Sequence, residues 1–158
     1  MVAGLGAMRI AAAAASLVVM THDAVAQSVC AGLDRLVPLA RSRFWSIRDE
    51  ANRSDLKTRV TQNLPGASEC WYHDSSRSYW CRWRITPSER KDAVRRLAST
   101  IGQCYGVRPA YSDDDVDETI AFVDLPGSVS IYVNGAGETL TISIGSTFSI
   151  PEPYPQAP

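Results

Sequence analysis

The sequence predicts a small α+β protein, a two-layer sandwich in which two helices pack on one face of an antiparallel sheet. Two segments carry apolar residues at three- and four-residue spacing, which is typical of amphipathic helices. Segments near the C-terminus alternate apolar and polar residues, which is typical of strands with one dry and one wet face. Four cysteines follow an apparent export signal, and this predicts two disulfides. The expected order is α-β-β-β-α-β-β-β.

Residues 1–26 have the features of a secretory signal peptide. Arg9 supplies the positive charge, residues 10–20 form a short apolar run, and Ala24-Val25-Ala26 is a small-x-small cleavage site. The run is too short to cross about 30 Å of hydrocarbon, so no stable membrane anchor is expected after cleavage. We therefore expect a single domain over residues 27–150, a proline-rich tail over 151–158, and a periplasmic or secreted location.

The first helix is expected over residues 28–48. Its apolar positions share one face and comprise Cys30, Leu33, Val37, Ala40, Phe44 and Ile47. Pro38 lies within it and predicts a kink or a break. Residues 49–55 are expected to form a loop and residues 56–64 a strand. The triplet Leu64-Pro65-Gly66 returns as Leu125-Pro126-Gly127, which hints at a duplicated unit of about 60 residues.

The segment 70–84 is the most unusual part of the chain. It holds two cysteines, three of the four tryptophans and a histidine. If residues 74–77 form a tight turn, Cys70 lies opposite Cys81 and Trp71 opposite Trp80, at a spacing that a disulfide accepts. Aromatic residues then occupy both faces of this hairpin. They either fill the core of a central hairpin or meet a partner, and the candidate binding residues are Trp71, His73, Trp80, Arg82 and Arg84.

The second helix is predicted to start at Thr86-Pro87-Ser88-Glu89, where a capping box precedes an apolar stripe. Gly106 is expected to end it in the left-handed conformation. Cys30 opens the first helix and Cys104 closes the second, so antiparallel packing of the helices brings them together. Among the three pairings that four cysteines allow, we expect Cys30–Cys104 with Cys70–Cys81.

Residues 107–118 are expected to form a loop, and three strands follow it, over 119–124, 128–134 and 138–144. The last two carry clear alternation, with the apolar face made by Val129, Ile131, Val133, Leu140, Ile142 and Ile144. We expect the residues 134–137, Asn-Gly-Ala-Gly, to form the turn between them.

Few residues offer catalytic or metal-binding chemistry. His73 is the only histidine after the signal, and Asp74 should point to the other face of its strand, so a Ser–His mechanism is disfavoured. The cysteine spacing lacks zinc-ligand pairs, and no cofactor is expected. The acidic run 113–118 lacks the spacing of a calcium loop, although Asp113, Asp115 and Asp117 are weak candidates for calcium ligands.

Charge is divided unevenly along the chain. Residues 27–105 contain 14 basic and 8 acidic residues, whereas residues 106–158 contain one basic and 8 acidic residues. This division favours either attraction between the two halves or an arginine-rich face for an acidic partner. The sequence therefore predicts an exported, non-catalytic domain that binds another protein or an envelope component, in the manner of an inhibitor or immunity protein, and no nucleic acid. The alternatives are a small carboxylate-dependent envelope hydrolase, with residues 113–118 at its site, and a structural envelope component.

Overall fold

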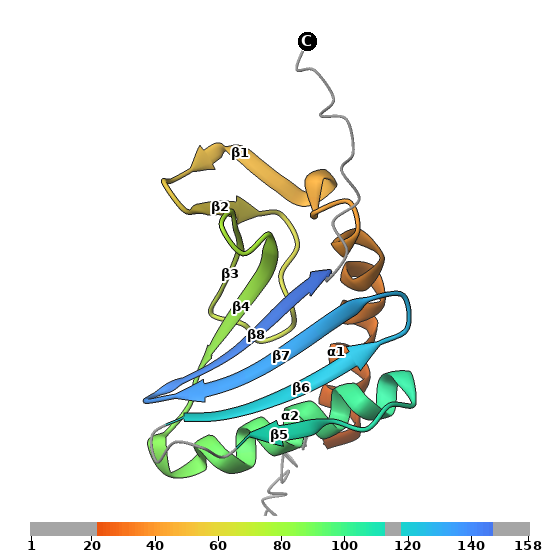
Figure 1. Cartoon of the computed structure of the whole chain (residues 1–158). Helices are drawn as coiled ribbons and strands as arrows, with labels where there is room; N and C mark the ends of the chain where they lie inside the picture. The colour runs from red at the N-terminus through yellow and green to blue at the C-terminus, as the bar shows by residue number, and fades with distance from the viewer. Residues whose placement is uncertain (1–21, 113–117, 147–158) are drawn as a thin grey trace, which may run out of the picture.

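The computed structural model describes residues 22–112 and 118–146, which form two helices and one eight-stranded sheet (Figure 1). The helices are α1 (His22–Leu36) and α2 (Arg90–Tyr105). The first four strands are β1 (Arg48–Arg53), β2 (Lys57–Val60), β3 (Glu69–His73) and β4 (Ser78–Arg84). The last four are β5 (Ala110–Ser112), β6 (Glu118–Leu125), β7 (Val129–Ala136) and β8 (Thr139–Ser146). The predicted fold class and the order of its elements are confirmed.

All neighbouring strands are antiparallel, in the order β1-β2-β3-β4-β8-β7-β6-β5. Each half of the chain is one helix followed by four strands, and the halves join where β4 pairs with β8. The two halves are thus related by an approximate twofold arrangement about this junction. The repeated Leu-Pro-Gly triplets precede β3 and β7, which are equivalent strands in this arrangement, so the topology agrees with the predicted duplication.

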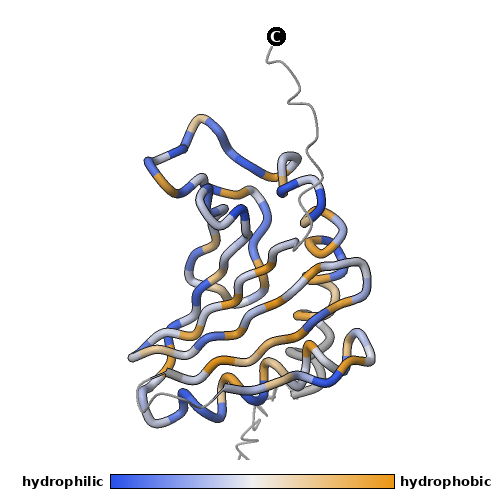
Figure 2. The backbone as a smooth tube through the Cα atoms, in the orientation of Figure 1, coloured by the Kyte–Doolittle hydropathy of each residue, from blue (hydrophilic) through white to orange (hydrophobic). Residues whose placement is uncertain are grey.

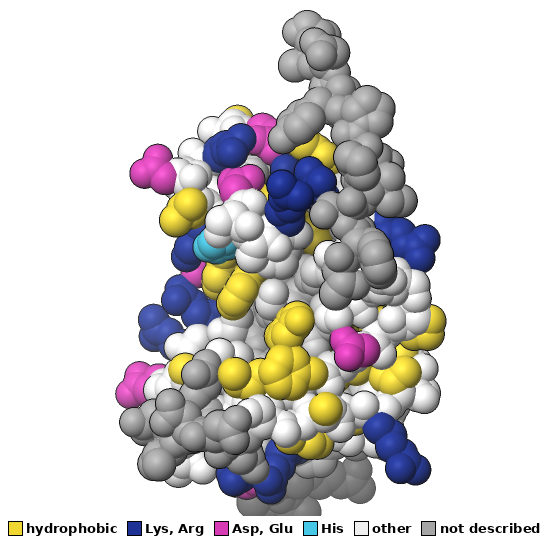
Figure 3. All heavy atoms as spheres, in the orientation of Figure 1, with side chains coloured by type: hydrophobic (Ala, Val, Ile, Leu, Met, Phe, Trp, Pro, Cys, Tyr) yellow, Lys and Arg dark blue, Asp and Glu magenta, His cyan; other side chains and the backbone are white. Residues whose placement is uncertain are grey.

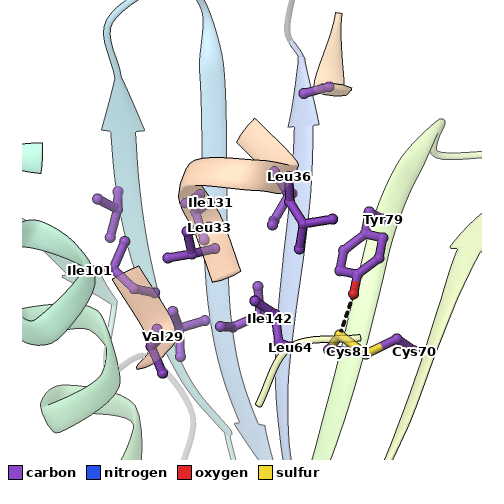
Figure 4. Packing of buried hydrophobic residues seen from close by; sticks show 14 of the residues in the cluster. Val29, Leu33, Leu36, Leu64, Cys70, Tyr79, Cys81, Ile101, Ile131 and Ile142 are labelled. Atoms are coloured by element: carbon purple, nitrogen blue, oxygen red, sulfur yellow. Dashed lines mark hydrogen bonds between the residues drawn. A yellow bond between two sulfur atoms is a disulfide. The ribbon is translucent and has the colours of Figure 1, made fainter. Parts of the chain in front are cut away.

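Both helices lie on the same face of the sheet. The hydrophobic core fills the space between the helices and the sheet. Figure 4 shows Leu33 of α1 and Ile101 of α2 directed towards Ile131 of β7 and Ile142 of β8. These four side chains are completely buried. The inward residues of β7 and β8 are the apolar positions of the alternating pattern, which confirms the predicted faces of the last two strands.

Both predicted disulfides are present. Cys30 joins Cys104 between the helices, and Cys70 joins Cys81 across β3 and β4. The first closes a sequence separation of 74 residues and the second a separation of 11. In the chain-entropy description, the longer loop stabilises the fold by about 4 kcal/mol and the shorter one by about 3 kcal/mol. No cysteine remains free.

The first helix is shorter than predicted, because it ends at Leu36 rather than at position 48. Pro38 lies in a 3-10 turn, Val37–Ala40, since proline has no N–H to continue the helical ladder. Arg43 and Phe44 then adopt positive φ angles of 52° and 58°, which turn the chain towards β1. Arg48 holds this turn, donating to the Arg43 carbonyl oxygen from Nε at 2.9 Å and from Nη2 at 2.6 Å.

The Arg48 guanidinium group is enclosed by aromatic rings. Its Cζ lies 3.4 Å from the centroid of Tyr72 and 4.2 Å from that of Trp45. Burial lowers the pKa of Arg48, and nearby Tyr72 and Glu50 oppose this effect. The cation–π contacts and the two carbonyl hydrogen bonds compensate for the lost hydration.

Two predicted loops contain strands. Strand β1 covers residues 48–53 and so replaces most of the predicted loop 49–55, and residues 110–112 form β5 within the predicted loop 107–118. Both are edge strands, so each pairs with one neighbour and needs no apolar face. Figure 2 shows that β1 is largely hydrophilic, which explains why its sequence suggests a loop. The predicted strand over 56–64 is confirmed in its first half, as β2, and ends at Val60.

The start and end of the second helix follow the prediction in outline. Pro87–Glu89 forms a 3-10 turn before α2, and Gly106 ends the helix with a φ of 66°. The Thr86 hydroxyl donates to Glu89 Oε2 at 2.6 Å instead of accepting from an amide. This hydrogen bond and a second one from the Thr86 backbone N–H lower the pKa of the exposed Glu89 carboxyl group.

The turn between β7 and β8 lies two residues later than predicted, at Gly137 and Glu138. Gly135 remains within β7 and faces α2. A Cβ atom at this position would lie 2.7 Å from Arg90 Cγ and 2.8 Å from Val94 Cγ2. Glycine at position 135 therefore allows α2 to approach the sheet closely.

We expect Gly135→Ala to destabilise the protein by about 1 to 3 kcal/mol, because the added methyl group overpacks the interface between helix and sheet. The matched control is Gly145→Ala in β8, where the new Cβ would meet Ser78 Cβ at an ordinary 3.5 Å. Urea denaturation of both variants measures the difference. Equal stability of the two variants would contradict the described packing of α2.

Candidate binding surface

The face of the sheet opposite the helices is here called the open face. The five predicted binding residues all lie on it, because alternate residues of β3 and β4 point the same way. Trp71 pairs with Trp80, and Glu69 pairs with Arg82, so these side chains share one side, while Cys70 and Cys81 share the other. The predicted hairpin register and its turn at residues 74–77 are confirmed.

Trp71 and Trp80 form a stacked pair in the middle of the first half of the sheet. Their ring centroids are 6.2 Å apart with an interplanar angle of 18°. Trp71 is only 8% exposed, and Lys57 Nζ lies 4.3 Å from its ring centroid. Trp80 is partly exposed, and its Nε1 donates to Ser78 Oγ at 2.6 Å. Trp71 is therefore a supporting residue, and Trp80 is the ring that a partner can reach.

The disulfide lies directly beneath this pair. Cys81 is fully buried, and its Sγ lies 3.0 Å from Tyr79 Oη (Figure 4). The Tyr79 hydroxyl donates to the Gln62 carbonyl oxygen at 2.8 Å. Burial raises the pKa of Tyr79 well above its ordinary value, so its phenol stays protonated. The disulfide and the Tyr79 hydrogen bond thus hold the strands that carry both tryptophans.

His73 lies at the end of β3, where its ring centroid is 6.1 Å from that of Trp80 and its Nδ1 faces hydroxyl groups of the adjoining turn. Its Nδ1 is 3.1 Å from Ser75 Oγ and 3.3 Å from Ser76 Oγ. Asp74 points away from it, accepting from Thr58 Oγ1 at 3.3 Å and lying 3.6 Å from Arg53 Nε. The histidine therefore lacks the carboxylate that would orient it as a general base.

The two predicted arginines lie towards the far end of β4. Arg82 forms an ion pair with Glu69 across the hairpin, and the Cζ of Arg82 is 5.9 Å from the Trp71 ring centroid. Arg84 lines a hollow together with Ser68 and Glu138. Because the side chains of Arg82 and Glu69 are both about half exposed, their ion pair contributes little to stability.

The open face also carries two aromatic residues that were not among the predicted binding residues. Tyr132 of β7 is 40% exposed, and Phe122 of β6 meets it edge-on, with centroids 5.2 Å apart and planes at 79°. Both occupy outward positions in alternating strands, and Ile120 lies on the same side of β6. Their aromatic side chains at outward positions of the alternating pattern are the sequence feature that could have predicted them as surface residues.

Strand register places these residues in one row across the sheet. The row runs through Trp71, Trp80, Ser143, Tyr132 and Phe122, one residue from each of β3, β4, β8, β7 and β6. Figure 3, which looks onto this face, shows hydrophobic side chains gathered near its middle. The row crosses the junction of the two halves, so neither half alone could form it.

Three of the hollows that the described residues form lie on this face. The largest of these three, of about 780 Å³, lies over β1–β3 and is lined by polar and charged residues that include Lys57, Arg59 and Asp49. A second, of about 570 Å³, contains Arg82 and Arg84. The third, of about 530 Å³, lies over β4, β8, β7 and β6, and its twelve lining residues are uncharged. It is called the central groove below.

Metal-binding chemistry finds no support among residues 22–112 and 118–146, where no three His, Cys, Asp or Glu side chains gather into a metal site. The weak calcium candidates Asp113, Asp115 and Asp117 lie outside the described residues, as does most of the acidic run 113–118. Within the same described ranges, no helix combines the length and the apolar character needed to span a membrane.

Comparison with protein-family models, with curated proteins and with solved structures finds no match for this chain. The function proposed below therefore rests on the residues of this chain alone.

Trp71→Ala should destabilise the protein by about 3 to 5 kcal/mol, because it removes a large ring that is almost fully buried. Tyr132→Ala should change the free energy of unfolding by only about 1 kcal/mol, since that ring is 40% exposed and has one aromatic neighbour. Chemical denaturation of both variants tests this. A Trp71 variant as stable as the Tyr132 variant would show that Trp71 does not support the surface.

Proposed function

We propose that the protein is an exported, non-catalytic binding domain that takes its ligand, a protein or another envelope component, on the open face of the sheet. The observation that carries this proposal is the row of aromatic rings, interrupted at Ser143, across a face that neither α1 nor α2 covers. Trp and Tyr are residues that dominate the energies of binding surfaces. The opposite face packs against α1 and α2 and holds the hydrophobic core.

Rigidity supports the same proposal. The strands that carry the row are central in the sheet, paired on both sides, and the Cys70–Cys81 disulfide lies beneath Trp71 and Trp80. A surface held in its binding geometry loses little conformational entropy when it meets a partner. Two disulfides also favour an oxidising location, the periplasm or the outside of a cell.

The alternative of a carboxylate-dependent hydrolase receives less support. Asp49 and Glu69 line the largest hollow together. Glu69 is paired with Arg82, and Asp49 accepts a hydrogen bond from Asn52 Nδ2 at 2.7 Å. Each carboxylate is thus engaged by another group of the chain, whereas an acid–base pair needs both groups directed at a substrate.

Affinity capture from a native envelope extract tests the proposal, with the purified chain as bait. Trp80→Ala and Arg82→Ala should each reduce the captured partner by about fivefold or more, because each removes a side chain typical of interface hot spots. The matched control is Tyr111→Ala. Tyr111 is 45% exposed and pairs with the helix-facing Ala121, so it projects from the opposite side of the sheet.

Capture that is unaffected by Trp80→Ala and Arg82→Ala, but lost with Tyr111→Ala, would move the binding surface to the helix side and refute the proposal. Near-UV circular dichroism of each variant confirms that the fold is retained.

A further inference from the structure

The central groove is built around a gap in the row of rings. Trp80 and Tyr132 occupy β4 and β7, and Ser143 lies between them on β8. Strands two positions apart in a sheet are separated by about 10 Å. A flat group stacked between two aromatic rings needs about 7 Å, twice the usual contact distance between carbon atoms. The gap therefore has room for one ring between Trp80 and Tyr132.

The two rings that border this gap, Trp80 and Tyr132, are each held by a neighbouring ring on the side away from β8. Trp80 stacks on Trp71 on the β3 side, and its indole N–H is held by Ser78 Oγ. Tyr132 is held by the edge-on contact with Phe122 on the β6 side. In each case the supporting ring is on the side away from β8, so the remaining surface of Trp80 and of Tyr132 lines the groove.

The floor of the gap is polar. Ser143 is only 7% exposed, and no side chain or backbone group within residues 22–112 and 118–146 hydrogen-bonds to its hydroxyl group, which is therefore available to a ligand. The hydroxyl groups of Thr141 and Tyr132, which also line the groove, likewise have no hydrogen-bond partner within these ranges. An occupant that covered these groups with hydrocarbon would leave them unpaired, which is unfavourable. An occupant that carries its own hydroxyl groups would pair with them.

The charge of the lining residues further narrows the class of ligand that the central groove can bind. None of the twelve residues that line the groove is charged. A charged ligand group would lose its hydration there without gaining an ion pair. A neutral sugar ring meets all these conditions, because its C–H surfaces pack on aromatic rings while its hydroxyl edges donate and accept hydrogen bonds.

We propose that the gap over Ser143, between Trp80 and Tyr132, is a binding site for one residue of a neutral glycan. This inference rests on the proposed function and specifies the envelope component as a carbohydrate. The charged hollows over β1–β3 and around Arg84 lie beside the groove and are outside this sugar site.

Isothermal titration calorimetry of the purified chain with chitohexaose, cellohexaose and maltohexaose tests the inference, and a heparin-derived hexasaccharide serves as the charged comparison. At least one neutral sugar should bind, and the sulfated sugar should bind more weakly. Tyr132→Ala should weaken binding about five- to tenfold through loss of one stacking wall. Ser143→Ala should weaken it about two- to tenfold through loss of the floor hydroxyl. Tyr111→Ala should leave it unchanged.

A blocked phenylalanine peptide distinguishes a sugar site from an apolar site. If the groove is built for an apolar side chain, this peptide binds and Ser143→Ala strengthens its binding, which would overturn the inference. Failure of every neutral sugar to bind at its solubility limit would also overturn it. If envelope capture still depends on Trp80 in that case, the proposed function survives and only the sugar assignment is lost.

Discussion

The pairing of β4 with β8 is the interaction on which the rest of the structure depends. It joins two similar halves, each a helix followed by four strands, into one sheet. It also places Tyr79 and Cys81 of the first half against Ile144 and Ile142 of the second, so that both halves share one core. Without this pairing, the aromatic residues of β3–β4 and those of β6–β7 would belong to separate surfaces.

The two faces of the sheet differ in the residues that they carry. On the inner face, the helices, the Cys30–Cys104 disulfide and an apolar layer provide stability. On the open face, hydroxyl groups and partly exposed rings surround a groove that residues 22–112 and 118–146 leave unfilled. The open face also contains the nearly buried Trp71, but its other rings, such as Trp80 and Tyr132, keep part of their surface exposed.

Much of the fold could be predicted because its signals are local. Alternation defined β7 and β8, the capping segment defined α2, and the symmetry of residues 70–84 defined both the hairpin register and one disulfide. Helix ends and edge strands were missed, because Pro38 and polar residues such as those of β1 leave the outcome to long-range contacts. The row of rings was half predicted: Trp71 and Trp80 stood out by composition, whereas Tyr132 and Phe122 joined them only through the β4–β8 pairing, a contact that no local pattern encodes.

Native-state amide hydrogen exchange tests the central claim, that the β4–β8 junction makes one sheet of two halves. Amides of β4 and β8 should be the slowest to exchange, and the free energy of their opening should equal that of global unfolding. Exchange of β1–β4 and β5–β8 as two independent units, with different opening free energies and weak protection at the junction, would contradict the account.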